Sequence, residues 1–196
     1  MTSSANSAAR VTALALGATV ITQLVYIGVS SAGIEPNRPV IWGLEALLFS
    51  AIALGGLVLL PARPIVGAGL ALGGVLNVIQ VGIGLVMFGP LIEAGEALTV
   101  VTQAVVALAF FLYFTGKFAL GVAAISLGVA MWRASSSAAK WLGVAAVLAG
   151  LTAFALNGAA MVIGMEPLMF PAGAAGTAAA LLLAILLWLA SPKVSG

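Results

Sequence analysis

The sequence predicts an all-α fold, a polytopic transmembrane helical bundle with six or seven membrane spans and short loops. Hydrophobic residues make up 63% of the 196 residues and charged residues only 6%, whereas a soluble domain carries roughly 25% charged residues. The mean hydropathy is +1.27. Several apolar runs reach the about 20 residues that a helix needs to cross a bilayer. Because a soluble fold of this composition would expose large apolar patches, lipid is the expected solvent for most of the chain.

Five spans are predicted with clear boundaries. Their edges carry proline, which cannot continue a helix interior. Residues 1–10 form a short polar tail that resembles the start of a signal peptide, but the apolar run after it exceeds a signal core of about 7–15 residues, so we expect a retained first helix. A single membrane domain of residues 11–190 and a tail of residues 191–196 complete the chain. The five spans are 11–31, 40–60, 65–88, 141–163 and 171–190.

The segment 96–133 is too long for one simple crossing. As a single helix it would measure about 55 Å, whereas the hydrocarbon core is about 30 Å thick. Two divisions compete. A break at Thr115-Gly116-Lys117 gives two crossings and seven spans in all. A break near 107–110 makes 110–133 one crossing and lets 92–107 dip into one surface or lie on it, which gives six spans.

The distribution of basic residues favours six spans. Cytoplasmic loops of membrane proteins are enriched in Lys and Arg. With a cytoplasmic N-terminus, six spans leave only Arg38 outside, whereas seven spans divide the basic residues almost evenly. Trp132 and Trp141 flank one short inner turn, as interfacial aromatic residues do. The sequence therefore predicts an integral protein of the bacterial cytoplasmic (inner) membrane, with these residues facing inside: Arg10, Arg63, Arg133, Lys140 and Lys193.

A weak internal repeat links the first and last helical hairpins. Gly33-Ile34-Glu35-Pro36 matches Gly164-Met165-Glu166-Pro167, and the same shift places Pro61 on Pro192. Under six spans the two hairpins have the same orientation. Under seven they are inverted, as the repeats of many transporters are.

The composition excludes several function classes. The chain has no Cys, His or Asp, which removes thiolate and imidazole metal sites and the usual Ser-His-Asp or Cys-His nucleophiles. Its scattered basic residues offer neither a nucleic-acid footprint nor the about four to eight clustered charges of a polybasic lipid patch. No phosphate-binding glycine loop of the Walker type occurs. We therefore expect a non-enzymatic protein without a metal or cofactor, whose first partner is the lipid bilayer.

Small and polar residues recur on one face of the third span. Gly69 and Gly73 form a GxxxG motif, and Asn77 and Gly84 continue it at helical spacing. Close approach through small residues drives helix association in lipid, where the hydrophobic effect gives no preference. The motif fits packing within the bundle, and equally a contact with a partner subunit or a second copy.

Polar residues on different spans are expected to share one layer. In the six-span model they lie roughly 7–12 Å below the outer edge, at 1.5 Å per residue. Charges at this depth are costly and face a bundle interior, a partner or water. Glu45 and Lys117 are expected partners because neither is cheap to bury alone, with Arg38 as a rival partner for Glu45. The predicted layer comprises Glu45, Lys117, Asn157, Gln80, Gln103 and Tyr26.

Two functions are compatible with these features. The first is an accessory or structural subunit of a larger membrane complex, favoured by the short loops and abundant small residues. The second is a carrier that binds a small solute or a lipid near the outer face, with Glu45 as acceptor, Lys117 as countercharge and the amides and Tyr26 as hydrogen-bonding groups. The same layer is also compatible with a purely structural role, as a polar clamp that fixes helix register.

Overall fold

The computed structural model describes residues 3–134 and 138–191. Within these residues the regular structure is helical, and six helices are long and apolar enough to cross a membrane, which confirms the predicted bundle. A short 3-10 helix, η1 (Gly95–Leu98), joins the third helix to the fourth. The predictions for Pro192, Lys193 and the turn at 135–137 concern positions outside the described residues. The six helices are α1 (Ser3–Ser31), α2 (Arg38–Leu59), α3 (Pro64–Glu93), α4 (Thr99–Ala134), α5 (Ala138–Ile163) and α6 (Met169–Leu189).

Both predicted break points in 96–133 are wrong. Helix α4 runs without interruption through 36 residues, about 54 Å, and the chain turns before it, where Gly95 adopts a positive φ of 58°. Neither predicted point contains a proline. The Thr115 hydroxyl donates to the Phe111 carbonyl at 2.7 Å, a bond that leaves the helix intact. Lys117 therefore lies in the middle of a helix.

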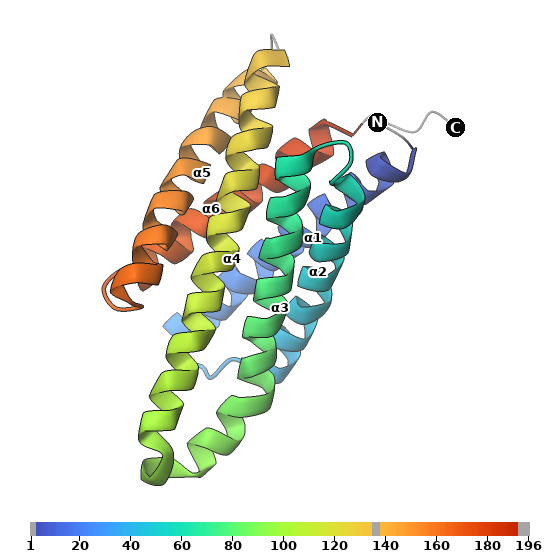
Figure 1. Ribbon diagram of the computed structural model, residues 1–196. Coiled ribbons are helices and arrows are strands. Elements are labelled where there is room, and N and C mark those ends of the chain that lie inside the picture. The colour runs from blue at the N-terminus through green and yellow to red at the C-terminus, as the bar shows by residue number, and fades with distance from the viewer. Residues whose placement is uncertain (1–2, 135–137, 192–196) are drawn as a thin grey trace.

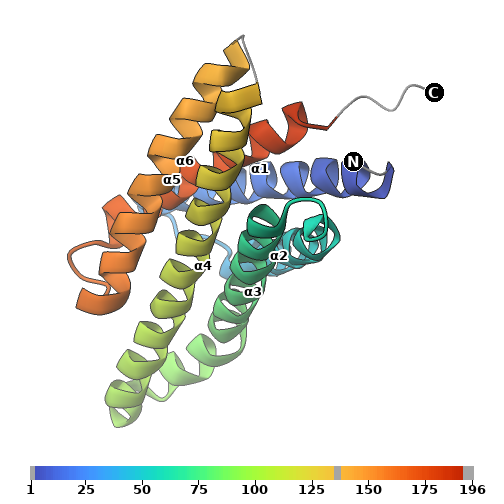
Figure 2. The same ribbon diagram turned by 45° about the horizontal axis from the view of Figure 1, so that its top comes forward.

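Five helices form a ring, and the sixth covers it from outside. Going round the ring, α1 packs on α2, α2 on α3, α3 on α4, α4 on α6, and α6 on α1, while α5 packs on α4 and α6 (Figures 1 and 2). Within the described chain, the backbones of α1 and α4 make no direct contact. Side chains must therefore fill the space between these two helices.

The first helix begins earlier than predicted. Most of the expected polar tail is helical, because α1 starts at Ser3 rather than near Val11. Ala5 and Ala9 are buried in the core. The Arg10 guanidinium donates to the Ser191 carbonyl at 3.4 Å and lies 5.6 Å from the centre of the Trp188 ring. These contacts hold the start of α1 against the end of α6.

Small residues let the helices approach closely. The α3 face predicted from the GxxxG motif packs inside the chain: a Cβ added at Gly69 would lie 2.6 Å from the Ala119 carbonyl of α4. Further along the same helix, Gly73 faces Leu120 of α4 and Gly84 faces Trp42 of α2. The Asn77 side chain packs on Gly116 and donates to the Gly73 carbonyl at 2.7 Å. These residues position α4 against α3.

The two hairpins related by the sequence repeat end their first helices alike. Gly33 follows α1 with a φ of 74°, and Gly164 follows α5 with a φ of 96°. Positive φ is a conformation that glycine adopts at little cost and that often terminates a helix. Both turns lie at the end of the molecule that carries the α3–η1–α4 turn, toward the bottom of Figure 1.

Candidate functional site

Lys117 is buried inside the ring of helices. Its side chain is 1% exposed, although a lysine carries a charge that the membrane interior disfavours. Lys117 Nζ donates to Gln23 Oε1 of α1 at 3.2 Å, and this nitrogen also lies 5.3 Å from the centre of the Tyr113 ring. A Cβ added at Gly176 of α6 would lie 2.8 Å from Lys117 Cδ, so this glycine makes room for the lysine stem. Lys117 therefore bridges α4 to α1 across the ring.

Glu45, a residue of α2, is buried against α1. Its side chain is 7% exposed, and Oε1 accepts a hydrogen bond of 2.8 Å from the Thr22 hydroxyl. Gln23 Oε1, which binds Lys117, also accepts from the Thr177 hydroxyl of α6 at 2.7 Å. These bonds form two networks, Thr22 with Glu45 and Gln23 with Lys117 and Thr177, which consecutive residues of α1 bring together. We call the two networks and the adjacent Tyr113 the polar cluster; it consists of Thr22, Gln23, Glu45, Tyr113, Lys117 and Thr177.

The structure corrects the expected direct pairing of Glu45 with Lys117. The two charges are close enough to attract one another. However, the ion pair found among residues 3–134 and 138–191 joins Arg38 to Glu35, at 3.8 Å in an exposed turn. The rival pairing of Arg38 with Glu45 is therefore also absent from the described residues. Consecutive residues of α1 hold the two buried charges separately, Thr22 on Glu45 and Gln23 on Lys117.

The other predicted layer residues do not hydrogen-bond to the polar cluster. Asn157 is buried and donates to the Ala153 and Ala172 carbonyls at 2.8 and 3.1 Å, which ties α5 to α6. Tyr26 and Gln80 are half-buried on α1 and α3, and Gln103 is exposed on the first third of α4. The predicted layer thus divides into a cluster around the two charges, and three amides and Tyr26 elsewhere.

Gln23, Thr22, Tyr113 and Thr177 were not among the predicted site residues. The sequence does contain a signal for two of them, since Thr22-Gln23 is a polar pair inside the apolar run of the first span. Gln23 and Lys117 are 94 positions apart in the chain, and only the ring arrangement of helices brings them together. Thr177 lies among small residues of α6 that give no indication of a role.

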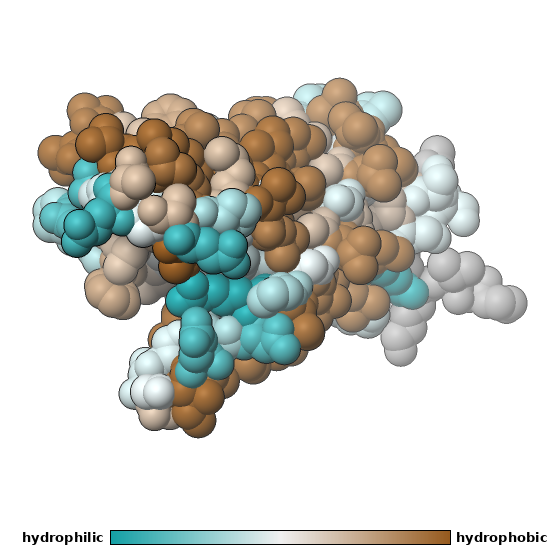
Figure 3. All heavy atoms as spheres, turned by 90° about the horizontal axis from the view of Figure 1, so that it is seen from below, coloured by the Kyte–Doolittle hydropathy of each residue, from teal (hydrophilic) through white to brown (hydrophobic). Residues whose placement is uncertain are grey.

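The accessible side of the polar cluster is formed by its neutral members. Glu45 and Lys117 are buried, whereas Thr22, Gln23 and Thr177 are half-buried. Viewed from the end with the acidic turns, hydrophilic residues gather in a hollow between apolar surfaces (Figure 3). The exposed acidic residues of this end are Glu35, Glu93, Glu96 and Glu166.

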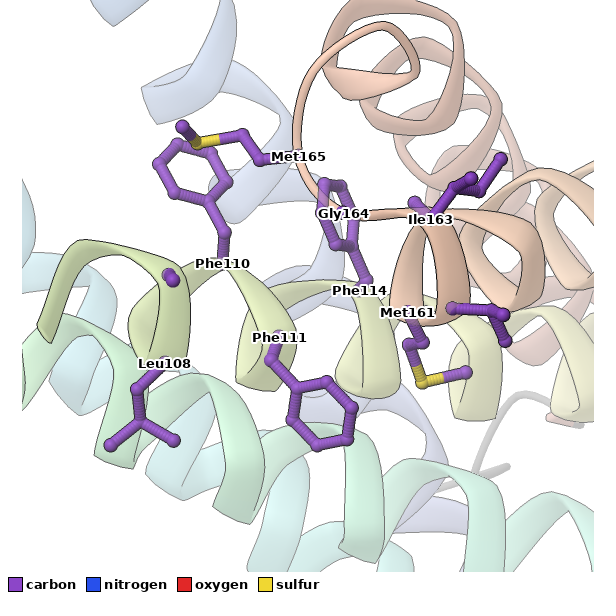
Figure 4. Close-up of a pocket in the computed structure, with 11 residues that line it drawn as sticks. Leu108, Phe110, Phe111, Phe114, Met161, Ile163, Gly164 and Met165 are labelled. Atoms are coloured by element: carbon purple, nitrogen blue, oxygen red, sulfur yellow. The ribbon is translucent and has the colours of Figure 1, made fainter. Parts of the chain in front are cut away.

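An apolar pocket of about 420 Å³ lies between α4 and the end of α5. Phe110, Phe114 and Met161 contribute to its lining (Figure 4). The Tyr113 ring lies edge-on to Phe110 and to Phe114, at 6.3 and 5.6 Å between ring centres. The aromatic residues of α4 therefore separate this pocket from Lys117. The lining consists of side chains that suit packing and apolar contact rather than catalysis.

Comparisons with known proteins do not indicate a function for this chain. The chain matches no known protein-family model, no curated protein and no solved structure. In the described part of the chain, His, Cys, Asp and Glu form no group of three or more that could hold a metal ion. The chemistry of the polar cluster is therefore that of one ammonium, one carboxylate and neutral hydrogen-bonding groups.

Proposed function

We propose that this chain is an integral membrane protein that binds a small polar solute in the polar cluster and carries it across the bilayer. The observation that supports this proposal is the pair of buried charges held apart by consecutive residues of α1. A clamp that only fixed helix register would gain most from a direct, fully hydrogen-bonded pair. Separate neutral partners leave each charge able to exchange its hydrogen bond for one to a ligand.

The charges favour a zwitterionic solute. Lys117 has three N–H donors and gives one to Gln23, while Glu45 accepts one hydrogen bond from Thr22. The charges of the cluster sum to zero. A singly charged ligand would add a net charge in a medium where uncompensated charge is costly. A solute with a carboxylate for Lys117 and an ammonium for Glu45 keeps the site neutral.

Ligand-induced stabilisation tests this proposal. The purified protein would be heated in mild detergent with glycine, β-alanine or γ-aminobutyrate, zwitterions of increasing charge separation, or with acetate or methylammonium. A ligand that binds only the folded state raises its stability, by about 2.7 kcal/mol at one hundred times its dissociation constant. We expect one of the zwitterions to raise the unfolding temperature and the singly charged compounds to leave it unchanged.

Matched variants locate the effect. Glu45→Gln and Lys117→Met should abolish the stabilisation, whereas Glu93→Gln makes the same carboxylate-to-amide change at the exposed end of α3 and should retain it. Uptake of the stabilising zwitterion into proteoliposomes then tests carriage. Equal stabilisation by acetate would contradict the zwitterion assignment, and an effect that survives Lys117→Met would remove the polar cluster as the site.

An accessory subunit of a larger membrane complex is the second candidate. It is favoured by the hairpin formed by α3, η1 and α4. Because Gln23 and Lys117 are level with one another, α4 extends about ten residues, roughly 15 Å, past the end of α1. This extension carries exposed apolar side chains, including Val86 and Val100 at 73% and 79% exposure. Stoichiometric co-purification of a second membrane protein, lost in Val100→Ser, would support this role.

The proposed orientation places the end with Arg10, Arg63 and Arg133 in the cytoplasm of a bacterial inner membrane, following the positive-inside rule. Two exposed turn positions test it in a chain that lacks cysteine. An impermeant maleimide applied to intact cells should label Ala94→Cys in the α3–α4 turn and spare Ala62→Cys in the α2–α3 turn. The reverse pattern would invert the orientation.

A further inference from the structure

A second candidate site lies at the other end of the bundle from the acidic turns. A groove of about 500 Å³ separates the start of α3 from the last third of α4. Its walls are apolar, with Ile65, Leu127 and Ala130 among them, and it contains two polar side chains, Arg63 and Ser126. Its volume falls in the range of about 300–1,000 Å³ that small-molecule sites occupy.

The Arg63 charge has no counterion within the described chain. Its guanidinium is half-buried, and it makes neither an ion pair nor a side-chain hydrogen bond with residues 3–134 or 138–191. Burial lowers the pKa of Arg63 from its usual value. Of the five glutamates in the sequence, Glu45 lies in the polar cluster and the rest lie in or beside turns at the opposite end. An anion that neutralises Arg63 must therefore come from outside these residues.

The level of the groove in the membrane suits a lipid. Trp132, Trp141 and Trp188 are exposed at the same end of the bundle, as expected for residues at the headgroup level. Leu127 lies six residues before Arg133 on α4, about 9 Å deeper along the helix. Arg63 immediately precedes α3 and lines the groove beside Leu127, so it lies below the exposed tryptophans, and Ile65 continues the groove into the apolar level.

We propose that this groove binds an anionic phospholipid. The Arg63 guanidinium donates to the phosphate, for which its planar set of N–H groups is well suited. One acyl chain lies along the exposed Ile65, and the buried Leu127 forms the floor of the groove. This is a single site built from one arginine and an apolar groove, distinct from a polybasic surface, and it is independent of the solute proposed for the polar cluster.

Native mass spectrometry of the delipidated full chain tests the site. Dioleoyl phosphatidylglycerol and dioleoyl phosphatidylcholine share their acyl chains and differ in headgroup charge. Both lipids offer a phosphate to Arg63, but the choline ammonium cancels the negative charge of phosphatidylcholine and leaves Arg63 without net compensation. We therefore expect the anionic lipid to be retained about tenfold more tightly. Arg63→Gln should remove this preference, and Arg133→Gln, which changes an exposed arginine at the same end, should leave it.

Two further measurements separate a lipid from a free phosphate. Ala130→Phe fills the groove at an exposed position without changing charge, so it should lower retention of phosphatidylglycerol. Inorganic phosphate at millimolar concentration should not compete with the lipid. Equal retention of both lipids, an equal loss in Arg133→Gln, full competition by phosphate, or unchanged retention in Ala130→Phe would each overturn the proposal. Ala130→Phe keeps the test open if Arg63→Gln does not fold.

Discussion

Helix α4 meets its two neighbours α5 and α1 in opposite ways. Toward α5 the backbones touch through paired glycines: a Cβ added at Gly121 or Gly150 would lie 2.9 or 2.7 Å from the carbonyl oxygen of the other glycine. Gly128 and Gly143 repeat the arrangement seven residues away, at 2.7 and 2.8 Å. Toward α1 the described backbones make no contact, and the Lys117 side chain spans the gap to Gln23.

The difference indicates which part of the bundle can change when a ligand binds. Close backbone packing through small residues is a main source of helix association in lipid, and it leaves no alternative arrangement of α4 against α5. The boundary between α4 and α1 is held by hydrogen bonds between side chains, which a polar ligand can replace. We therefore infer that α4 and α5 form the fixed part of the molecule and that the second half of α1, which carries Thr22 and Gln23, is the part that can be displaced.

Disrupting the glycine contact between α4 and α5 should have the largest effect on stability. Gly150→Val directs a branched side chain at the Gly121 carbonyl, and the backbone there cannot yield without separating the helices. We expect a loss of about 3 kcal/mol, the upper part of the range for overpacked sites. The measurement is the fraction of protein that remains monodisperse after heating in detergent. Gly82→Val makes the same change where nothing lies within 4 Å of the added atom and should be tolerated.

Removing the Lys117 charge, on the side of α4 that faces α1, should destabilise the protein less than Gly150→Val. Lys117→Met leaves Glu45 buried without its countercharge. Breaking a direct buried pair costs about 3–5 kcal/mol. Because Thr22 and Gln23 separate the two charges, we expect about 2 kcal/mol in the same heating assay. Adding Glu45→Gln should recover part of the loss. A double variant that loses the full sum of the single effects would show that the two sites are not coupled.

The contrast between these two sides also marks what the sequence could predict. Length, hydropathy and edge prolines were sufficient for five of the helices, and the distribution of basic residues favoured six spans over seven. The cost of charge in lipid was sufficient to single out Glu45 and Lys117. The continuity of α4 through Lys117 was not predictable, since it depends on a ring of helices with room for the lysine. The bond to Gln23 was missed for the same reason, because periodicity within one helix carries no information on which helix faces it.

A smaller effect is expected from Gln23→Leu, which tests the bridge across the gap. This change removes the oxygen that accepts from both Lys117 and Thr177. An unsatisfied buried donor costs about 1–3 kcal/mol, and we expect about 1.5 kcal/mol. Gln80→Leu is the matched control, because Gln80 is half-buried on α3 and makes no hydrogen bond with the described residues. Equal effects of the two changes would remove Gln23 as the bridging residue.

The smallest effect should come from Thr177→Val, which keeps the shape of the side chain and removes its hydroxyl. Gln23 loses one of its two donors but keeps Lys117, so we expect about 0.5–1 kcal/mol. Thr152→Val provides the reference, because the Thr152 hydroxyl bonds to the Leu148 carbonyl of its own helix at 2.9 Å, as Thr177 does to Gly173. The difference between the two variants isolates the contact with Gln23. If the second half of α1 is the displaceable part, saturating the polar cluster with the stabilising zwitterion should reduce that difference toward zero, whereas the loss in Gly150→Val should be unaffected.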